Sequence, residues 1–178
     1  MKMTVKLAEE RVGSLSSPSK MPGYGYSTPA EDCITGSKLA EVVDSICSFC
    51  YARKGRYVFR NVKQAMKKRL KSLQRLDWVD MMVFMIGKRE KSGFFRWHDS
   101  GDVQDLNHLQ KIYSVCRLTP SKRHWLPTRE AWIKDHLKDK PNNLVIRFSA
   151  PMVDQRAPAS WPNSSEVVTS GASCPAAK

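Results

Sequence analysis

The first half of the chain has apolar residues at helical spacing. Residues 37–45 carry this spacing over a short stretch, which predicts a short helix. Residues 58–76 carry a longer apolar stripe with Lys and Arg in the other positions, so we expect an amphipathic helix whose polar face is cationic. Asp77 can cap a further helix that ends near Gly87.

The second half alternates short apolar runs with helical segments. The predicted strands are Phe94–His98, His124–Leu126 and Leu144–Phe148, and the predicted helices are Leu106–Cys116 and Arg129–Lys138. This alternation at near-equal intervals implies right-handed crossovers and a mostly parallel sheet. The predicted fold class is therefore α/β, with a small, partial barrel-like sheet, N-terminal helices and a cysteine-rich metal-binding segment.

Length and composition suit one domain. The 178 residues are 41% hydrophobic, which is enough for a real core. We expect an irregular N-terminal arm over 1–30, an α/β core over 33–150 with a cluster-binding segment at 33–55, and an irregular tail over 151–178. No apolar run is long enough to cross a membrane and the N-terminus lacks an apolar signal region, so we expect a cytoplasmic protein without a membrane partner.

The strongest chemical signal is the pair Cys47 and Cys50, with Cys33 upstream. Two thiolates separated by two residues, with a third brought back by a short segment, are typical of a soft-metal or iron–sulfur site. Cys174 precedes a proline, a common setting for a last cluster ligand, and is the candidate fourth ligand. Cys116 lies in an apolar stripe, which predicts a core thiol.

Three interpretations of these cysteines stay open. A disulfide or ordinary buried thiols fit poorly with an odd number of cysteines, of which there are five. Structural zinc bound by four cysteines usually shows two tight pairs, and this chain has one. An iron–sulfur cluster tolerates scattered ligands better, so we favour a four-iron cluster on Cys33, Cys47, Cys50 and Cys174.

Polar residues follow the predicted strands. Ligand sites of parallel sheets lie beyond the carboxyl ends of the strands, where these loops open on one rim. The candidate substrate or cofactor rim consists of His98, Asp99, Ser100, Asp102, Thr128, Arg129 and Glu130. Such groups could bind a metal, a ribose or an amino group, or transfer protons, while Asp102 and Thr128 could equally cap helices.

The charge distribution indicates a polyanionic partner. The formal net charge is +13, and no acidic residue occurs between Ser45 and Leu76. Nucleic acid is the usual partner of such a surface, although one solvated helix face would look the same. The candidate nucleic-acid-binding residues are Arg53, Lys54, Arg56, Arg60, Lys63, Lys67, Lys68, Arg69 and Lys71.

Several segments together resemble a known phage family. Cys33 and the segments 46–55, 95–102 and 125–130 are similar to the gene product 88 family. The resemblance covers most of the chain from Cys33 to Ser149. It implies a phage origin, a cysteine-bound cluster and a location in the cytoplasm of the infected bacterium.

A looser resemblance concerns the radical S-adenosylmethionine motif. There an aromatic residue precedes the last of three cluster cysteines, as Phe49 precedes Cys50, and a Gly-rich acidic turn for the methionine moiety follows a strand, as Ser100-Gly101-Asp102 does. The first cysteine spacing is longer than in that motif. This resemblance implies an enzyme with an open three-cysteine cluster, whereas a closed four-cysteine cluster would serve structure or redox sensing.

Two further alternatives remain. A zinc-stabilised nucleic-acid-binding module would use the same cysteines. The turn Asp99-Ser100-Gly101, followed by Gln104, is similar to the active-site turn of base-exchanging transglycosylases, where the Asp takes part in catalysis. The second similarity implies a base-modifying enzyme.

Overall fold

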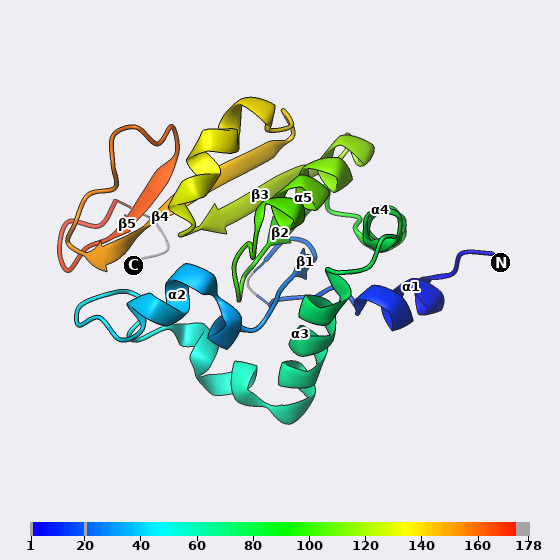
Figure 1. The fold of residues 1–178 in the computed structure, drawn as a ribbon, viewed down its shortest axis with the longest axis horizontal. Coiled ribbons are helices and arrows are strands. Elements are labelled where there is room, and N and C mark those ends of the chain that lie inside the picture. The colour runs from blue at the N-terminus through cyan, green and yellow to red at the C-terminus, as the bar shows by residue number, and fades with distance from the viewer. Residues whose placement is uncertain (1, 20, 174–178) are drawn as a thin grey trace.

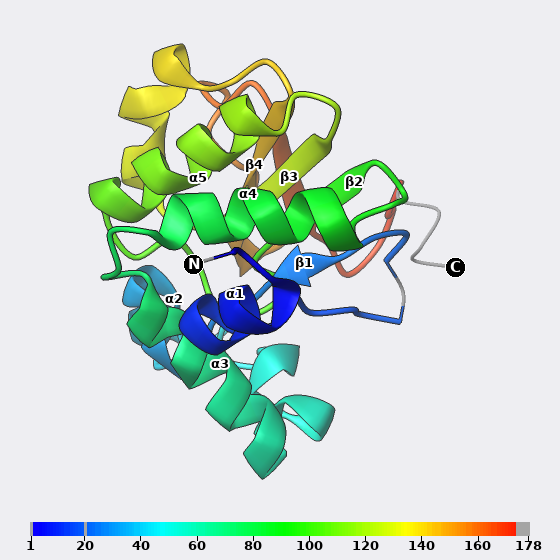
Figure 2. The same cartoon turned by 90° about the vertical axis from the view of Figure 1, so that its right-hand side faces the viewer.

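Five parallel strands form one sheet, and α4 and α5 pack along one of its faces (Figures 1 and 2). The computed structural model describes residues 2–19 and 21–173. The strands are β1 (Gly25–Tyr26), β2 (Phe94–Trp97), β3 (Arg123–Thr128), β4 (Leu144–Val153) and β5 (Ser164–Val167). The α-helices are α1 (Val5–Val12), α2 (Ile34–Leu39), α3 (Arg60–Ser72), α4 (Trp78–Arg89) and α5 (Leu106–Leu118). The 3-10 helices are η1 (Ala30–Asp32), η2 (Tyr51–Arg53), η3 (Gly55–Val58) and η4 (Ala131–Asp139).

The strands lie in the sheet in chain order, from β1 to β5, and every neighbouring pair is parallel. This is the order found in a segment of a β/α barrel, where each strand is joined to the next by a crossover on the same side. The predicted α/β class and parallel sheet are therefore confirmed. All five strands direct their carboxyl ends toward one edge, which the following loops cover.

Aromatic side chains fill the centre of the core. Tyr26, Trp78 and Trp97 are fully buried, with ring centroids of Tyr26 and Trp78 5.6 Å apart and those of Trp78 and Trp97 6.1 Å apart. Strand β2 contributes Phe95 and Trp97 to this core, while Phe94 and Arg96 point to the other face of the sheet. One face is thus packed against helices, and the other carries a separate set of side chains.

The helical predictions hold for α3, α4 and α5, and the corrections concern shorter elements. The segment predicted as a helix over 37–45 forms only α2, which begins earlier and ends at Leu39. The segment after β3 is the 3-10 helix η4 instead of an α-helix. Asp77 precedes α4 as expected, but its carboxylate pairs with Arg11 and Arg75 and does not cap the helix.

The N-terminal segment is not an irregular arm throughout. Thr4 caps α1 by accepting a hydrogen bond from Leu7 N at 3.2 Å, and Ala8 and Val12, one turn apart, are fully buried. Helix α1 packs against α4. The mixture of Ser, Pro and Gly that follows hid this two-turn helix from the sequence analysis.

The C-terminal segment likewise contains regular structure. Strand β4 runs on to Val153, and β5 adds a further parallel strand. Trp161, between them, stacks on Phe148 with ring centroids 4.7 Å apart. The described helices include none with the length and apolar character needed to cross a bilayer.

Candidate functional site

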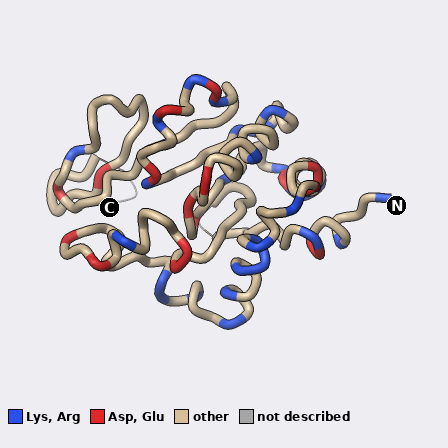
Figure 3. Tube along the Cα trace, in the orientation of Figure 1, with Lys and Arg blue, Asp and Glu red and all other residues tan. Residues whose placement is uncertain are grey.

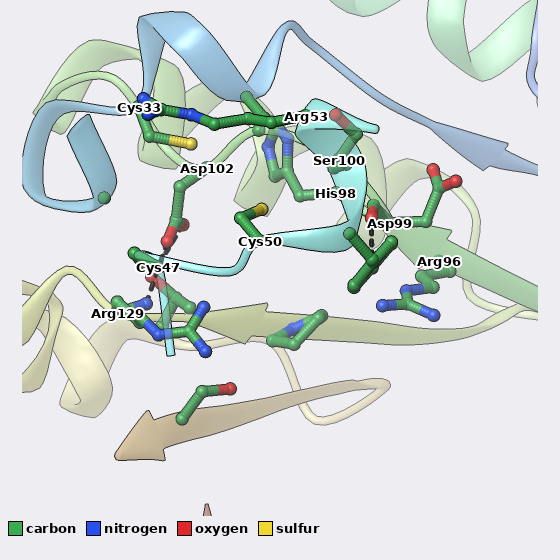
Figure 4. Close-up of a pocket in the computed structure, with 18 residues that line it drawn as sticks. Cys33, Cys47, Cys50, Arg53, Arg96, His98, Asp99, Ser100, Asp102 and Arg129 are labelled. Atoms are coloured by element: carbon green, nitrogen blue, oxygen red, sulfur yellow. Dashed lines mark hydrogen bonds between the residues drawn. The ribbon is translucent and has the colours of Figure 1, made fainter. Parts of the chain in front are cut away.

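Three cysteines lie around one cavity at the carboxyl edge of the sheet (Figure 4). Cys33 precedes α2, and Cys47 and Cys50 lie in the loop between α2 and η2. The cavity has a volume of about 190 Å³. Cys116 is buried in the core on α5, as predicted. Cys174 lies outside the described residues.

The loop that carries Cys47 is tied to the end of β4. Ser45 and Met152 form an antiparallel bridge, and Ile46 N donates to Pro151 O at 2.9 Å. The buried Ser45 hydroxyl also accepts from Ser48 N at 3.1 Å. The loop is therefore fixed to the end of β4 directly before Cys47.

Gly36 makes room for two of the thiols. A Cβ atom at this position would lie 3.5 Å from Cys33 Sγ and 3.6 Å from Cys47 Sγ, and only 3.0 Å from Cys33 Cβ. Both sulfurs therefore approach the same backbone segment, where a larger side chain would crowd them. This close approach explains why a glycine occupies position 36 of α2, although glycine is a poor helix former.

Burial controls the charge of these thiols. It raises the pKa of Cys33 far above its usual range, and the negative charges of Asp102 and the other cysteines act in the same direction. Burial also raises the pKa of Cys47, although the nearby Arg129 guanidinium opposes this shift. Without a metal the thiols of Cys33 and Cys47 are therefore protonated at neutral pH, and a bound metal would have to displace these protons.

The turn after β2 supplies one wall of the cavity. His98 has a φ of 56°, is buried, and lies with Nδ1 3.5 Å from Thr28 Oγ1. Burial holds the pKa of His98 well below its usual value, so the ring is neutral. The Asp99 carboxylate accepts hydrogen bonds from Ser27 Oγ and, at 2.9 Å, from Tyr57 OH. Gly101 has a φ of 81°, and a Cβ there would meet Thr28 Oγ1 at 2.0 Å.

Asp102 joins the turn after β2 to the end of β3. Its carboxylate accepts from Thr128 Oγ1 at 2.7 Å, from Arg129 N at 2.8 Å and from Val103 N at 2.8 Å. Burial nevertheless raises the pKa of Asp102 to about 6, because these hydrogen bonds only partly offset desolvation. Asp102 does not cap the following helix, because Asp105 does so by accepting from His108 N at 2.7 Å.

Glu130 holds the Cys33 segment in place. Its buried carboxylate accepts from Thr35 N at 3.0 Å, Thr35 Oγ1 at 2.8 Å and Trp132 Nε1 at 3.1 Å. Thr35 lies two residues after Cys33, at the start of α2. Glu130, predicted as a rim residue, does not line the cavity and instead anchors one cysteine to the end of β3.

Several buried polar atoms beside the cavity have no hydrogen-bond partner among the described residues. They are Arg96 Nε, His98 Nε2, Ser100 Oγ and Arg129 Nε. Native proteins leave few such atoms unpaired, so each calls for an explanation. Their concentration around one cavity favours a polar ligand there.

Most predicted site residues meet at this cavity. Its lining includes the predicted Cys33, Cys47, Cys50, Arg53, His98, Asp99, Ser100, Asp102, Thr128 and Arg129. Sequence reasoning missed Arg96, Tyr51 and Gly36. The signal that could have indicated Arg96 is its charge, two residues before His98 within the predicted strand.

The three thiols do not form a ready site for a single metal ion. Within residues 2–19 and 21–173, no three His, Cys, Asp or Glu side chains are arranged so that they could hold one as they stand. A zinc ion with bonds of about 2.3 Å would draw its sulfurs to within about 3.8 Å of one another. The predicted metal-binding segment therefore remains a proposal.

A cationic projection lies next to the cavity. Lys and Arg residues gather on α3 and on the turns before it (Figure 3). We call residues 53–71 the basic lobe. Its exposed predicted cations are Lys54, Arg56, Arg60, Lys67, Lys68 and Lys71. Arg53 lines the cavity, and Lys63 pairs with Glu31 at 3.1 Å.

Arg69 does not belong to the exposed face of the basic lobe. It is only 6% exposed, donates to Ser14 O at 2.8 Å and to Ser27 O at 3.2 Å, and lies over the Tyr26 ring. Its guanidinium is used to satisfy backbone carbonyls inside the fold. The prediction that Arg69 contacts nucleic acid is corrected on this ground.

Comparisons with known proteins give one family. A family model described as Gene product 88 matches residues 2–172. No curated protein and no solved structure matches the chain.

Glu130 offers a test of how the cysteine loop is held. We expect Glu130→Ala to lower the free energy of unfolding by about 1–3 kcal/mol, because part-buried donors on Thr35 and Trp132 lose their acceptor. We also expect faster hydrogen exchange at the Thr35 amide. Urea denaturation and exchange measured by NMR check both effects. Glu10→Ala, at an exposed position of α1, is the control and should change stability by less than about 0.5 kcal/mol. Equal stability of the two variants would contradict the anchoring role.

Proposed function

Because the chain belongs to the gene product 88 family of phage proteins, whose model spans nearly its whole length, we propose that it is an iron–sulfur protein of that family. In this proposal Cys33, Cys47 and Cys50 hold a four-iron cluster at the carboxyl edge of the sheet. The observation that carries it is the convergence of these three thiols on one cavity with unpaired polar atoms.

A cluster suits these thiols better than a single zinc ion. Each cysteine of a four-iron cluster binds a different iron, so the sulfurs need not approach one another as closely as around zinc. The thiols come from two segments on either side of α2, with Gly36 leaving space between Cys33 and Cys47. The zinc-stabilised alternative would require these segments to close in.

The unpaired atoms favour a cluster with one iron left open to a ligand. The cavity presents a guanidinium from Arg129, a hydroxyl from Ser100 and a neutral imidazole from His98. These groups suit a small molecule with carboxylate and amino groups, such as S-adenosylmethionine. When bound, the cluster would supply an electron to that ligand.

Strand order supports the resemblance to radical S-adenosylmethionine enzymes. The cysteines follow β1, and the acidic turn with Gly101 follows β2, so both motifs lie at one edge of adjacent parallel strands. Asp102 fixes this turn through Thr128 and Arg129 N. His98 also lines the cavity, and its Nε2 has no hydrogen-bond partner among the described residues, so this atom is available to a bound ligand.

The transglycosylase-like alternative has less support. A catalytic carboxylate needs a free oxygen to reach the reacting atom. Asp99 instead accepts hydrogen bonds on both oxygens, from Ser27 and Tyr57, and its own carbonyl accepts from Tyr51 OH. These contacts favour a role in joining the basic lobe to the cavity wall.

Metal analysis of cysteine variants tests the cluster. After anaerobic purification we expect about four iron and about four sulfide per chain, with Cys33→Ala, Cys47→Ala or Cys50→Ala each losing both. Cys116→Ala is the matched control, because this thiol lies in the core, and it should retain the cluster if folded. Circular dichroism shows whether each variant is folded.

Cys174→Ala separates the two forms of the proposal. Retention of iron and sulfide in this variant supports three protein ligands and an open iron. Loss of both supports a closed cluster with Cys174 as fourth ligand, serving structure or redox sensing. Zinc with no iron in the wild-type protein would contradict both forms.

We further propose that the partner is nucleic acid, held by the basic lobe. The exposed cations of the lobe are accompanied by the exposed rings of Phe59, within the lobe, and Tyr51, just before it, a combination that suits phosphates and bases. Tyr57 of the lobe donates to the Asp99 carboxylate and the preceding Tyr51 donates to the Asp99 carbonyl, so the lobe is joined directly to the cavity wall. A bound strand would therefore pass close to the cavity.

The salt dependence of binding tests this partner. We expect Lys67→Gln, Lys68→Gln and Lys71→Gln, combined, to flatten the slope of log affinity against log salt by about two for a single strand, because fewer counterions are released. Fluorescence anisotropy with a labelled oligonucleotide measures the slope. The control variant replaces three exposed lysines outside the lobe, Lys91, Lys134 and Lys138, by Gln, and so removes the same amount of charge. Absence of binding at low salt, or equal slopes in both variants, would contradict the proposal.

A further inference from the structure

A second, larger cavity lies along the face of the sheet opposite the core residues of β2. The alternation of the strands places Phe94 and Arg96 of β2, Trp125 of β3, and Val145 and Arg147 of β4 on this face. We call this surface the sheet groove. It has a volume of about 1330 Å³ and is bordered by residues 164–168 and 171–173. This is more room than a typical small-molecule pocket, which spans about 300–1,000 Å³.

The charge of the sheet groove is predominantly positive. Arg96, Arg123 and Arg147 line it, and Glu166 is the acidic residue among its described lining. None of these arginines pairs with an acid in the part of the chain that the structure describes. Arg147 donates to Ser164 O at 2.8 Å, and Glu166 accepts from Ala157 N at 2.8 Å. Guanidinium groups left without a carboxylate suit phosphate oxygens.

Aromatic surface accompanies these charges. The Arg96 guanidinium lies 4.6 Å from the centre of the Trp125 ring, which is half-buried, and Phe94 is 46% exposed. Flat rings in a cationic groove bind unpaired bases by stacking, whereas the bases of a duplex are already stacked on one another. The chemistry of the sheet groove therefore matches a single strand better than a duplex.

The sheet groove continues into the cavity that holds the cysteines. Residues two apart on a strand share a face, and here Trp125 is followed by Pro127 on β3 and Arg147 by Ser149 on β4. The first member of each pair lines the groove and the second lines the cysteine cavity, while Arg96 lines both. Both cavities thus lie on one face of the sheet.

We propose that the sheet groove holds a segment of single-stranded nucleic acid, with a base on Trp125 and phosphates at Arg123 and Arg147. The strand would run along β2, β3 and β4 toward their carboxyl ends and present a nucleotide to the cysteine cavity. Its role as a substrate rests on the proposed function, but its binding does not, because no groove residue is a proposed cluster ligand. The groove is also a different surface from the basic lobe.

Binding of a labelled oligothymidylate by the full chain tests the inference. We expect Trp125→Ala to weaken binding about fivefold or more, since it removes a base-stacking surface, and Trp125→Phe to retain most of the affinity. Arg123→Gln with Arg147→Gln should weaken binding and flatten its salt dependence. Arg117→Gln, at an exposed position of α5, is the single-charge control and should bind like wild type. Thermal unfolding confirms that each variant is folded.

Photo-crosslinking identifies the bound surface. A thymidine analogue in the oligonucleotide should crosslink to a peptide containing Trp125, even when Lys67, Lys68 and Lys71 are replaced by Gln. Crosslinks confined to the basic lobe, or equal affinity of Trp125→Ala and wild type, would overturn the inference. Thymidine monophosphate binding as tightly as the oligonucleotide would also overturn it, because a strand gains from several contacts.

The same titration after removal of iron by chelation separates this inference from the proposed function. Groove binding that persists without iron supports the inference whatever the metal analysis gives. If protein that carries a full cluster shows no crosslink at Trp125, the inference is overturned and the proposed function is not.

Discussion

The arrangement of chemical groups in this protein depends on the parallel pairing of five strands in chain order. Backbone hydrogen bonds between neighbours fix this order, and they direct every carboxyl end to the same edge of the sheet. Loops far apart in sequence therefore meet there. Strand order thus brings the cysteines after β1, the acidic turn after β2 and the polar residues after β3 to one edge of the sheet.

Strand order alone does not fix the cysteines, because they lie in a loop with little regular structure. Two sets of hydrogen bonds hold that loop: Glu130 accepts from Thr35, and the segment around Ser45 pairs with the end of β4. Buried carboxylates such as Glu130 and Asp102 are costly to desolvate, and each is offset by several donors. A buried carboxylate with several donors holds its segment in one position, and a reactive group on that segment is then placed precisely.

The periodic parts of the fold were predictable from the sequence, and the local anchors were not. Strand and helix alternation predicted β2, β3, β4 and α5 because their apolar positions repeat over enough residues to give a clear period. Helix α1 was missed because only two turns of apolar spacing precede a loop rich in Ser and Pro. The grouping of Cys33, Cys47 and Cys50 followed from their spacing, whereas the anchoring role of Glu130 depends on which distant donors meet it. Arg69 has the same sequence environment as its exposed neighbours, and only the packing of α3 shows it to be buried.

The central claim is that three cysteines hold a cluster with one iron open to a small ligand at the edge of the sheet. Mössbauer spectroscopy tests this claim most directly. The spectrum of anaerobic protein enriched in the Mössbauer-active iron isotope is recorded with and without S-adenosylmethionine. We predict a four-iron cluster in which one iron site changes its signal when S-adenosylmethionine is added and the other sites keep theirs. A spectrum in which no iron site responds to the ligand, or a protein that holds no iron, would contradict it.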